Sequence, residues 1–478
     1  MKVLFVASEF TPLAKVGGLG DVIGSLPMAL AKLGVSVSVI IPRYEQVNLK
    51  KIGAKIFVRN FPVNAAGGKE YVNLYKTKSS GKVTLYLLEN NRYLSRGPIY
   101  FEHTAFVGSF KEIQRFLFFS KAVCELLPRI GANIVHCNDW HTGALVAMLA
   151  RQRANGKSQI TPKTVFTIHN LANQGTWGAG EIADWLGPNN FKKLGGAFNF
   201  MAEGVKNADI ITTVSETYAR EIQTKQYGAR LHKFLKKRNG EKMLVGILNG
   251  IDYSYWPPVK RNKEKFQKEF GFKVNNRSPI FGLVARLTRQ KGINLVAPII
   301  SKLVQKYGAQ FVFLGQGEAK NEKALRDLAK KFPKNVFVKV GFDEKLAHEI
   351  YAQSDFFLMP SIFEPSGLGQ MIAMRYGTIP IVRATGGLKD SVVNEKTGFV
   401  FKKPAAQALY GAIINALGCY ADPKKFNAII KNCKKQDFSW SESAKKYLKI
   451  YKGLKIHHSR EPRHMPYGLP RQRGRKEK

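Results

Sequence analysis

Cysteines are few and widely spaced in this chain of 478 residues, with four in all and no Cys-x-x-Cys pair. Neither a disulfide framework nor a cysteine-based zinc site is therefore predicted. No run of about 18 apolar residues occurs, so no transmembrane helix is predicted. The N-terminal residues lead directly into a strand-like segment and lack the layout of a signal peptide. These absences predict a cytoplasmic protein with reduced thiols.

Acidic residues are also scarce, because 34 Asp and Glu stand against 76 Lys and Arg, for a formal net charge of +42. Such an excess is typical of proteins that bind a polyanion such as nucleic acid. Most of the lysines are scattered along the sequence, however, and no nucleic-acid-binding signature is present. A generally basic proteome is the favoured explanation, and nucleic acid is not an expected partner. A non-enzymatic nucleic-acid-binding protein stays open as an alternative.

Apolar runs of strand length alternate with segments of helical length, and this pattern occurs twice. The runs of the first half include KVLFVAS, VSVSVII, VTLYLLE, ANIVHC, KTVFTIH and ADIITTVS, with helices expected at 21–33, 109–129 and 142–154. Those of the second half are PIFGLVARL, QFVFLGQG, NVFVKVGF, DFFLMPS, TIPIVRA and TGFVF, with helices expected to begin near Ile293, Asn321, Glu344 and Leu368. Continuous apolar strands divided by helices predict parallel sheets that are covered on both faces.

The two repeats of this pattern predict two doubly wound α/β domains that face each other across a cleft. The first domain is expected to span 1–248 and the second 249–436, with a linker around Pro257 and Pro258. A last helix within 437–456 is expected to cross back to the first domain. The basic segment 457–478 has little apolar content, so we expect it to be disordered.

A glycine-rich turn follows the first strand, at the sheet edge where ligands of such folds bind. In AKVGGLGD, Lys15 precedes Gly17, Gly18 and Gly20, and Asp21 is placed to cap the next helix. Amide groups near a helix N-terminus favour an anion. The turn is therefore a candidate phosphate site, and a tight turn beside a solvated lysine is the alternative.

The second half contains complementary groups at the ends of its own strands. ARLTRQKG places Arg286 and Lys291 where both can reach one diphosphate. In PSIFEPSGLGQ, Glu364 precedes a glycine-rich helix start, so a carboxylate that can hold sugar hydroxyls lies beside amides that can hold phosphate. ATGGLKD repeats this shape at 384–390. Solvated cations and a capping glutamate are the alternatives.

Two more polar clusters end strands of the first half. HCNDWHTG places Asp139 and Trp140 between two histidines, without a metal-ligand spacing that the rest of the chain completes. An aromatic ring beside a carboxylate suits stacking on sugar rings, and a buried tryptophan is an equal alternative. TIHNLANQG places His169 and Asn170 at the end of a strand.

Seven segments in order resemble motifs of the bacterial glycogen synthase and plant starch synthase family of retaining glycosyltransferases. They are KVGGLGDV, HCNDWHTG, TIHNLANQG, LNGIDYSYWPP, ARLTRQKG, PSIFEPSGLGQMIAMRYG and ATGGLKD. The resemblance implies a GT-B fold of two Rossmann-like domains. It also implies transfer of glucose from a nucleotide-glucose to the non-reducing end of an α-1,4-glucan, without a metal or other cofactor. ADP-glucose is the favoured donor; UDP-glucose, a small acceptor and the oligomeric state stay open.

The resemblance implies roles for most of the candidate residues. Lys15 and the backbone of Gly17 and Gly18 approach the diphosphate from the first domain, and Arg286 and Lys291 neutralise it from the second. The carboxylate against the transferred glucose is Glu364, and His169 lies on the opposite wall. The other donor-side residues are Asp21, Phe342, Ser366, Gly367, Leu368 and Gly369, and those toward the acceptor are Asp139 and Asn170.

Three positions depart from patterns of these relatives. Ser366 stands where many of them have cysteine, and both side chains are small. Ile372 stands where the broader E-x7-E pattern has a second glutamate, which argues against a two-carboxylate mechanism. Phe342 replaces a tyrosine that lies near the base in some relatives, and its ring retains the ability to stack.

Overall fold

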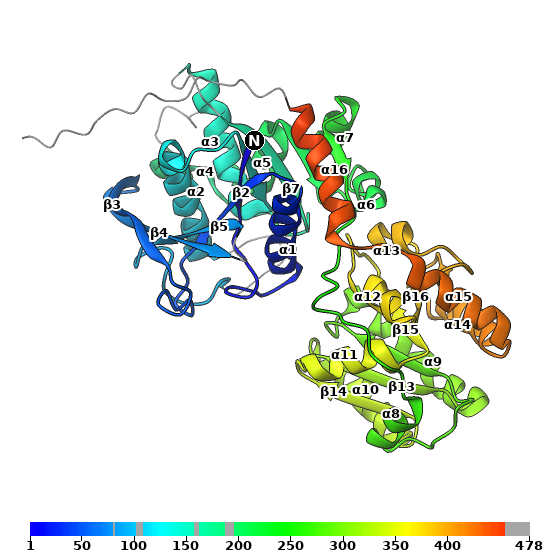
Figure 1. Ribbon diagram of the computed structural model, residues 1–478. Coiled ribbons are helices and arrows are strands. Elements are labelled where there is room, and N and C mark those ends of the chain that lie inside the picture. The colour runs from blue at the N-terminus through cyan, green and yellow to red at the C-terminus, as the bar shows by residue number, and fades with distance from the viewer. Residues whose placement is uncertain (80–81, 102–108, 157–161, 187–195, 455–478) are drawn as a thin grey trace, which may run out of the picture.

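The computed structural model describes residues 1–79, 82–101, 109–156, 162–186 and 196–454. Two lobes are visible in Figure 1, each built around its own β-sheet. We call the lobe that contains the nine-stranded sheet the first lobe and the lobe that contains the six-stranded sheet the second lobe. Within the described ranges, no helix combines the length and the apolar character needed to cross a bilayer.

The sheet of the first lobe has the strand order β11-β10-β7-β6-β1-β2-β5-β4-β3. Its strands are β1 (Lys2–Val6), β2 (Ser36–Pro42), β3 (Lys55–Ala65), β4 (Gly68–Ser79), β5 (Val83–Glu89), β6 (Ile134–Asn138), β7 (Lys163–Ile168), β10 (Ile210–Thr213) and β11 (Leu244–Gly246). β3 and β4 pair antiparallel, as do β4 and β5, and the other pairs are parallel. The chain order reverses between β1 and β6, which opens a crevice at their carboxyl ends.

Helices cover both faces of this sheet. They are α1 (Gly18–Lys32), α2 (Phe110–Ile130), α3 (Gly143–Ala154), α4 (Ala179–Leu186), α5 (Phe200–Asn207), α6 (Glu216–Glu221) and α7 (His232–Gly240), and a small hairpin pairs β8 (Thr176–Gly178) with β9 (Ala197–Asn199). One core joins the sheet to α2, α3 and α5, and a second core joins its other face to α1. Burial on both faces explains why the central strands are continuous apolar runs.

The second lobe has a fully parallel sheet in the order β14-β13-β12-β15-β16-β17. The strands are β12 (Ile280–Val284), β13 (Gln310–Gly315), β14 (Val336–Val340), β15 (Phe356–Met359), β16 (Ile379–Arg383) and β17 (Phe399–Phe401). Its helices are α8 (Lys263–Glu269), α9 (Ile293–Tyr307), α10 (Ala319–Lys331), α11 (Glu344–Gln353), α12 (Gly369–Tyr376), α13 (Gly386–Ser391), α14 (Ala406–Tyr420) and α15 (Pro423–Lys435). The order reverses between β12 and β15, so this lobe has a crevice of its own.

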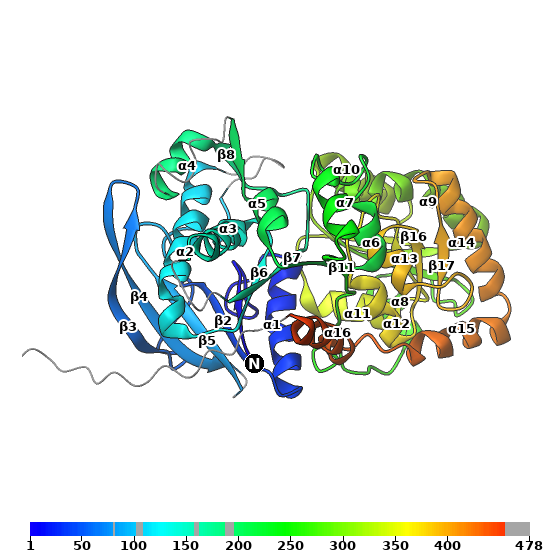
Figure 2. The ribbon, with the colours of Figure 1, turned by 90° about the horizontal axis from the view of Figure 1, so that it is seen from above.

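The last helix of the described chain, α16 (Trp440–Gly453), packs on the first lobe although its sequence follows the second. Figures 1 and 2 show it beside α1 at the junction of the lobes. Tyr447 and Tyr451 are buried in the core of the α1 face, and Tyr451 Oη lies 2.6 Å from His136 Nδ1. The expected boundary between 248 and 249 stays a prediction, and the expected tail 457–478 lies outside the described residues.

The predicted α/β architecture of two doubly wound units is confirmed, with two local corrections. The β3–β4 hairpin was not predicted, because most side chains of β3 are exposed and form no continuous apolar run. The interpretation of Asp21 as a helix cap is wrong. Helix α1 already begins at Gly18 after an N-cap at Gly17, and Asp21 lies in its first turn.

Candidate active site

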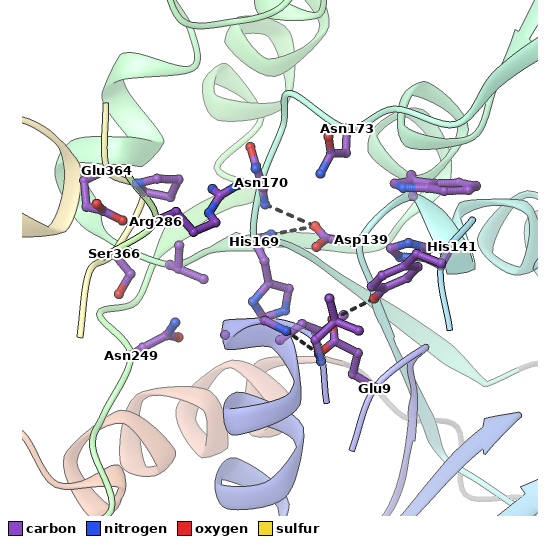
Figure 3. Close-up of a pocket in the computed structure, with 18 of the residues that line it drawn as sticks. Glu9, Asp139, His141, His169, Asn170, Asn173, Asn249, Arg286, Glu364 and Ser366 are labelled. Carbon is purple, nitrogen blue, oxygen red and sulfur yellow. Dashed lines mark hydrogen bonds between the residues drawn. The ribbon is translucent and has the colours of Figure 1, made fainter. Parts of the chain in front are cut away.

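A cavity of about 520 Å³ lies between the lobes, at the carboxyl ends of the strands that flank both crevices. The residues around it from the first lobe include Glu9, Gly17, Gly18, Tyr100, Glu112, Asp139, Trp140, His141, His169 and Asn170. Those from the second lobe include Arg286, Lys291, Glu364, Ser366, Gly367 and Leu368. In Figure 3, Glu364 and Ser366 lie on one side of the space, and Asp139 and His141 lie on the other.

A glutamate that the sequence analysis did not single out organises the glycine-rich turn of the first lobe. Glu9 Oε2 accepts hydrogen bonds from the amides of Val16 at 2.8 Å and Gly17 at 2.9 Å, and Tyr100 Oη donates to Glu9 Oε1 at 2.7 Å. The Gly17 amide therefore already donates to a carboxylate of the protein. Gly18 begins α1, and the first amides of a helix have no partner inside it. Gly18 is thus the better placed of the two predicted glycines to offer its amide to an anion.

Lys15 and Asp21 form an ion pair beside this turn. They line neither this cavity nor a smaller, adjacent cavity of about 310 Å³. Their Nζ and Oδ1 atoms lie 2.7 Å apart, and the Lys15 side chain is 45% exposed. Burial raises the pKa of Asp21, while the hydrogen bond from Lys15 opposes that rise. The Lys15 ammonium is therefore held beside the turn, outside both cavities.

Asp139 determines the backbone conformation at the end of β7. Its Oδ1 accepts hydrogen bonds from the amides of His169 at 2.7 Å and Asn170 at 3.3 Å. Burial raises the pKa of Asp139 to about 7, although these two hydrogen bonds lower it. Asp139 itself has φ of 55°, a conformation that non-glycine residues seldom adopt. The carboxylate therefore holds the turn that carries both predicted residues.

The hydrogen bonds of Asn138 determine the tautomer of His169. Asn138 Nδ2 donates to the carbonyl oxygens of Val6 and His136, both at 3.1 Å, so its Oδ1 is an acceptor. His169 Nε2 lies 3.0 Å from that oxygen and therefore carries the hydrogen, which leaves Nδ1 as the acceptor of the ring. Burial lowers the pKa of His169 to about 3. His169 is thus a neutral side chain that can accept a hydrogen bond from a hydroxyl group.

Glu364 and Lys291 form an ion pair on the wall of the second lobe. Lys291 Nζ lies 2.5 Å from Glu364 Oε2, and Ser361 Oγ donates to the same oxygen at 3.0 Å. Both members of the pair are mostly buried. Arg286 is exposed, and its Nη2 donates to Gln290 Oε1 at 3.2 Å. One cation is therefore held by the carboxylate, and the other lies at the solvent side.

The segment after Glu364 leads into α12 with several polar groups at the cavity. Ser366 Oγ is buried and has no hydrogen-bond partner within the described residues. Gly367 has φ of 69°, which suits glycine. Leu368 is the N-cap of α12 and provides no side-chain cap. Gly369 lines a second, adjacent cavity of about 310 Å³, which shares Arg286 and Glu364 with the first.

Phe342 is largely exposed, with 86% of its surface accessible. It lines neither cavity. Together with Lys15 and Asp21, it forms the set of predicted residues that the structure leaves outside the two cavities. The other predicted residues all lie on their walls.

Sequence reasoning missed several residues of the cavity wall. Glu9 directly follows the first strand, so the rule that located the glycine turn could also have located this carboxylate. Asn249 lies in the quoted segment LNGIDYSYWPP. Glu112 comes from α2 and carried no signal. Burial raises its pKa to about 7, and neither carboxylate oxygen has a hydrogen-bond partner within the described residues.

Metal-ligating side chains do not cluster in the part of the chain that the structure describes, where no group of three or more His, Cys, Asp and Glu residues could hold an ion. The chemical groups that converge on the cavity are instead cations, carboxylates, helix N-termini and neutral hydrogen-bonding side chains. Such a set can bind a phosphorylated sugar and stabilise negative charge on a departing phosphate.

Known proteins share both the sequence and the fold. Residues 2–237 match the starch synthase catalytic domain, and residues 264–436 match glycosyl transferases group 1. A glycogen synthase of Alkaliphilus metalliredigens is 39% identical, and the alignment covers 95% of this chain and 100% of that protein. The chain belongs to the glycogen synthase and starch synthase family. It is therefore a glucosyltransferase.

Another glycogen synthase and a solved starch synthase support the assignment over the same length, and a more distant protein shares the fold alone. A glycogen synthase of Desulforudis audaxviator is 40% identical, with 95% of this chain and 96% of that protein covered. The catalytic domain of starch synthase IV from Arabidopsis thaliana, solved with ADP and acarbose, superposes with a TM-score of 0.82 at 31% identity, covering 95% of this chain and 99% of that domain. Sucrose-phosphate synthase from Thermosynechococcus elongatus, at 19% identity and a TM-score of 0.62, shares the fold. The predicted GT-B architecture is confirmed.

Proposed function

We propose that this glucosyltransferase moves glucose from ADP-glucose to the non-reducing end of an α-1,4-glucan, with retention of the anomeric configuration. The observation that carries the proposal is one cavity in which Arg286, Lys291 and Glu364 face His169 of the other lobe. The choice of ADP-glucose is supported by the match to a starch synthase solved with ADP. The reaction requires no metal in this proposal, because protein cations neutralise the diphosphate.

The leaving group is stabilised by positive groups from the second lobe and by helix amides. Arg286 and Lys291 bind the diphosphate, and the amides of Gly18, Gly367 and Leu368 add hydrogen bonds. A preorganised donor that acts on developing charge contributes roughly 3 kcal/mol to the transition state. Lys291 is now paired with Glu364, so the diphosphate competes with that carboxylate for Lys291.

The hexose is held between the walls of the two lobes. Glu364 accepts hydrogen bonds from sugar hydroxyls on one side. Neutral His169 accepts one through Nδ1 on the other, and Asp139 keeps it in place through the backbone. As the bond between C1 and the diphosphate oxygen breaks, the acceptor hydroxyl bonds to C1 on the same face. Its proton passes to the departing phosphate, so the products are ADP and a glucan longer by one glucose.

Three further residues have proposed roles, and two of them, Lys15 and Phe342, lie outside the cavity. Lys15 would leave Asp21 and reach the glucose and diphosphate when the lobes close, which also excludes water. Phe342 would stack on the base of the nucleotide. Asn170 lies toward the acceptor, beside Asp139. We further propose that the enzyme acts in the cytoplasm, as expected of a bacterial-type glycogen synthase.

The test supplies the protein with ADP-glucose or UDP-glucose and with glycogen or a small sugar as the acceptor. We expect ADP release that equals the number of glucose units added to glycogen, and slower turnover of UDP-glucose. Glu364→Ala should abolish most turnover, whereas Glu264→Ala should not, since Glu264 and its partner Lys268 both have exposed side chains. Nucleotide release without growth of the glucan, or full activity of Glu364→Ala, would contradict the proposal.

A further inference from the structure

Helix α6 of the first lobe binds α13 of the second lobe through paired hydrogen bonds. The Thr217 amide donates to Asp390 Oδ2 at 2.7 Å, and Thr217 Oγ1 donates to Asp390 Oδ1 at 2.5 Å. At the other end of α6, Glu221 accepts hydrogen bonds from the Gly386 amide and Thr385 Oγ1, both at 3.1 Å. We call Ser215, Thr217, Glu221 and their partners on the second lobe the lobe clasp.

Ser215 connects the clasp directly to the segment that carries Glu364. Its Oγ donates to the carbonyl oxygen of Pro365 at 2.6 Å, and Ser215 is fully buried. Ser215 Oγ also accepts a hydrogen bond from the Tyr218 amide at 3.1 Å and thereby caps α6. A side chain of the first lobe therefore holds the residue that follows Glu364 on the second lobe.

Helix α13 packs so tightly on the Glu364 segment that the two must move together. The Gly387 amide donates to the carbonyl oxygens of Glu364 at 3.2 Å and Pro365 at 3.1 Å. A Cβ atom at Gly386 would lie 1.9 Å from the Glu364 oxygen, and one at Gly387 would lie 2.1 Å from the Ser366 oxygen. Only glycine fits either position. This explains the two adjacent glycines of ATGGLKD, Gly386 and Gly387, to which the proposed phosphate contacts assign no role.

We infer that Ser215, Thr217 and Glu221 are positioning residues that hold the Glu364 segment in register with the His169 wall of the first lobe. Ser215 acts through the Pro365 carbonyl, and the other two act through α13. The clasp is then a direct contact between the lobes beside the cavity. This inference deepens the proposed function and rests on it only for its kinetic readout.

The primary test is Ser215→Ala, with Ser215→Thr as the variant that keeps the hydroxyl. The matched control is Thr77→Ala, whose hydroxyl also donates to one carbonyl, that of Ile52, at 2.8 Å within the first lobe. We expect Ser215→Ala to lower kcat about tenfold while the KM for ADP-glucose changes less than about twofold. Ser215→Thr should recover most of that loss, and Thr77→Ala should show none.

A double-mutant cycle separates positioning from a general loss of stability. If Ser215 acts through Glu364, Ser215→Ala should cost about tenfold in the parent but less than about twofold in a Glu364→Gln background. An equal loss in both backgrounds would contradict the inference. If Ser215→Ala folds poorly, Asp390→Asn can replace it in the cycle with Glu364→Gln. This substitution turns one of the two carboxylate oxygens that accept from Thr217 into an amide nitrogen.

Amide hydrogen exchange of residues 364–369 provides a readout that needs no substrate. Exchange in this segment should be at least about tenfold faster in Ser215→Ala than in the parent and unchanged in Thr77→Ala. Unchanged exchange in both would overturn the inference whatever the activity. An inactive parent enzyme with faster exchange in Ser215→Ala would contradict the proposed function and leave the clasp supported.

Discussion

Lys291 Nζ lies 2.5 Å from Glu364 Oε2, so the cation proposed for the leaving group pairs with the carboxylate proposed for the hexose. Each residue therefore limits the charge that the other presents to a ligand. Separation of the pair has an electrostatic cost, which binding of a diphosphate to Lys291 offsets. Substitution of Glu364 and substitution of Lys291 should consequently have different effects on the affinity for the donor.

Glu364→Gln should lower kcat about a hundredfold or more without raising the KM for ADP-glucose, because it frees Lys291 for the diphosphate. Lys291→Met should lower kcat by about a hundredfold and also raise the KM, because it removes a donor to the diphosphate. Steady-state kinetics of both variants measure these effects. A higher donor KM in Glu364→Gln would argue against competition for Lys291.

Lys15→Ala should lose most turnover while the protein folds normally. The side chain is 45% exposed and pairs only with Asp21 in the described structure, and exposed pairs of this kind contribute about 0–1 kcal/mol. Activity assays and thermal unfolding of the same preparation check both statements. Parent-like turnover would remove Lys15 from the proposed donor site.

Phe342→Ala should raise the KM for ADP-glucose without lowering Tm. The ring is 86% exposed, so its removal costs little packing, whereas stacking of a base on an aromatic ring contributes about 1–3 kcal/mol. We expect an increase of about tenfold in KM. The control is Tyr71→Ala, an aromatic residue 59% exposed on β4, which should leave the KM unchanged.

Asp139→Asn should change how stability depends on pH. Burial raises the pKa of Asp139 to about 7, above the value of about 3.9 expected for an unfolded chain. Between those values the folded protein binds more protons at this carboxyl, so its contribution to the free energy of unfolding falls as pH rises. Above about pH 7 the buried carboxyl is ionised in the folded protein, and the full free-energy cost of burying that charge lowers its stability. Asparagine tolerates the positive φ and does not titrate.

Urea unfolding of both proteins from pH 5 to 8 measures this difference. The stability of Asp139→Asn relative to the parent should rise by about 3 kcal/mol up to pH 7 and then level off. Burial lowers the pKa of His136 and His169 to about 3, so these two residues make the free energy of unfolding rise with pH. Their contribution is the same in both proteins and cancels in the difference between them. A difference independent of pH would show that Asp139 does not titrate there.

Tyr451→Phe should destabilise the contact between α16 and the first lobe. It removes the hydroxyl 2.6 Å from His136 Nδ1 and leaves that buried nitrogen without this partner, at a cost of about 1–3 kcal/mol. Thermal unfolding checks the loss. Tyr376→Phe is the control, because the Tyr376 hydroxyl has no hydrogen-bond partner among the described residues, and its Tm should stay close to that of the parent.

Local sequence determined the parallel strands and the residues that end them. Strands such as β1, β12 and β15 are buried on both faces and are therefore continuous apolar runs. The ends of β12 and β15 in the sequence show that Arg286 and Glu364 follow the carboxyl ends of strands. The antiparallel β3 was missed because it is largely exposed and lacks such a run. Its formation depends on its pairing with β4.

Only the tertiary structure decided which charged groups neutralise one another and how the lobes are joined. Glu9 binds the Gly17 amide, Lys291 binds Glu364, and Ser215 binds Pro365. The last two of these contacts join residues 73 and 150 positions apart in the chain. Hydrogen bonds and ion pairs are effective only over a few ångströms. Their partners are thus set by the packing of helices and lobes, which no local pattern of residues records.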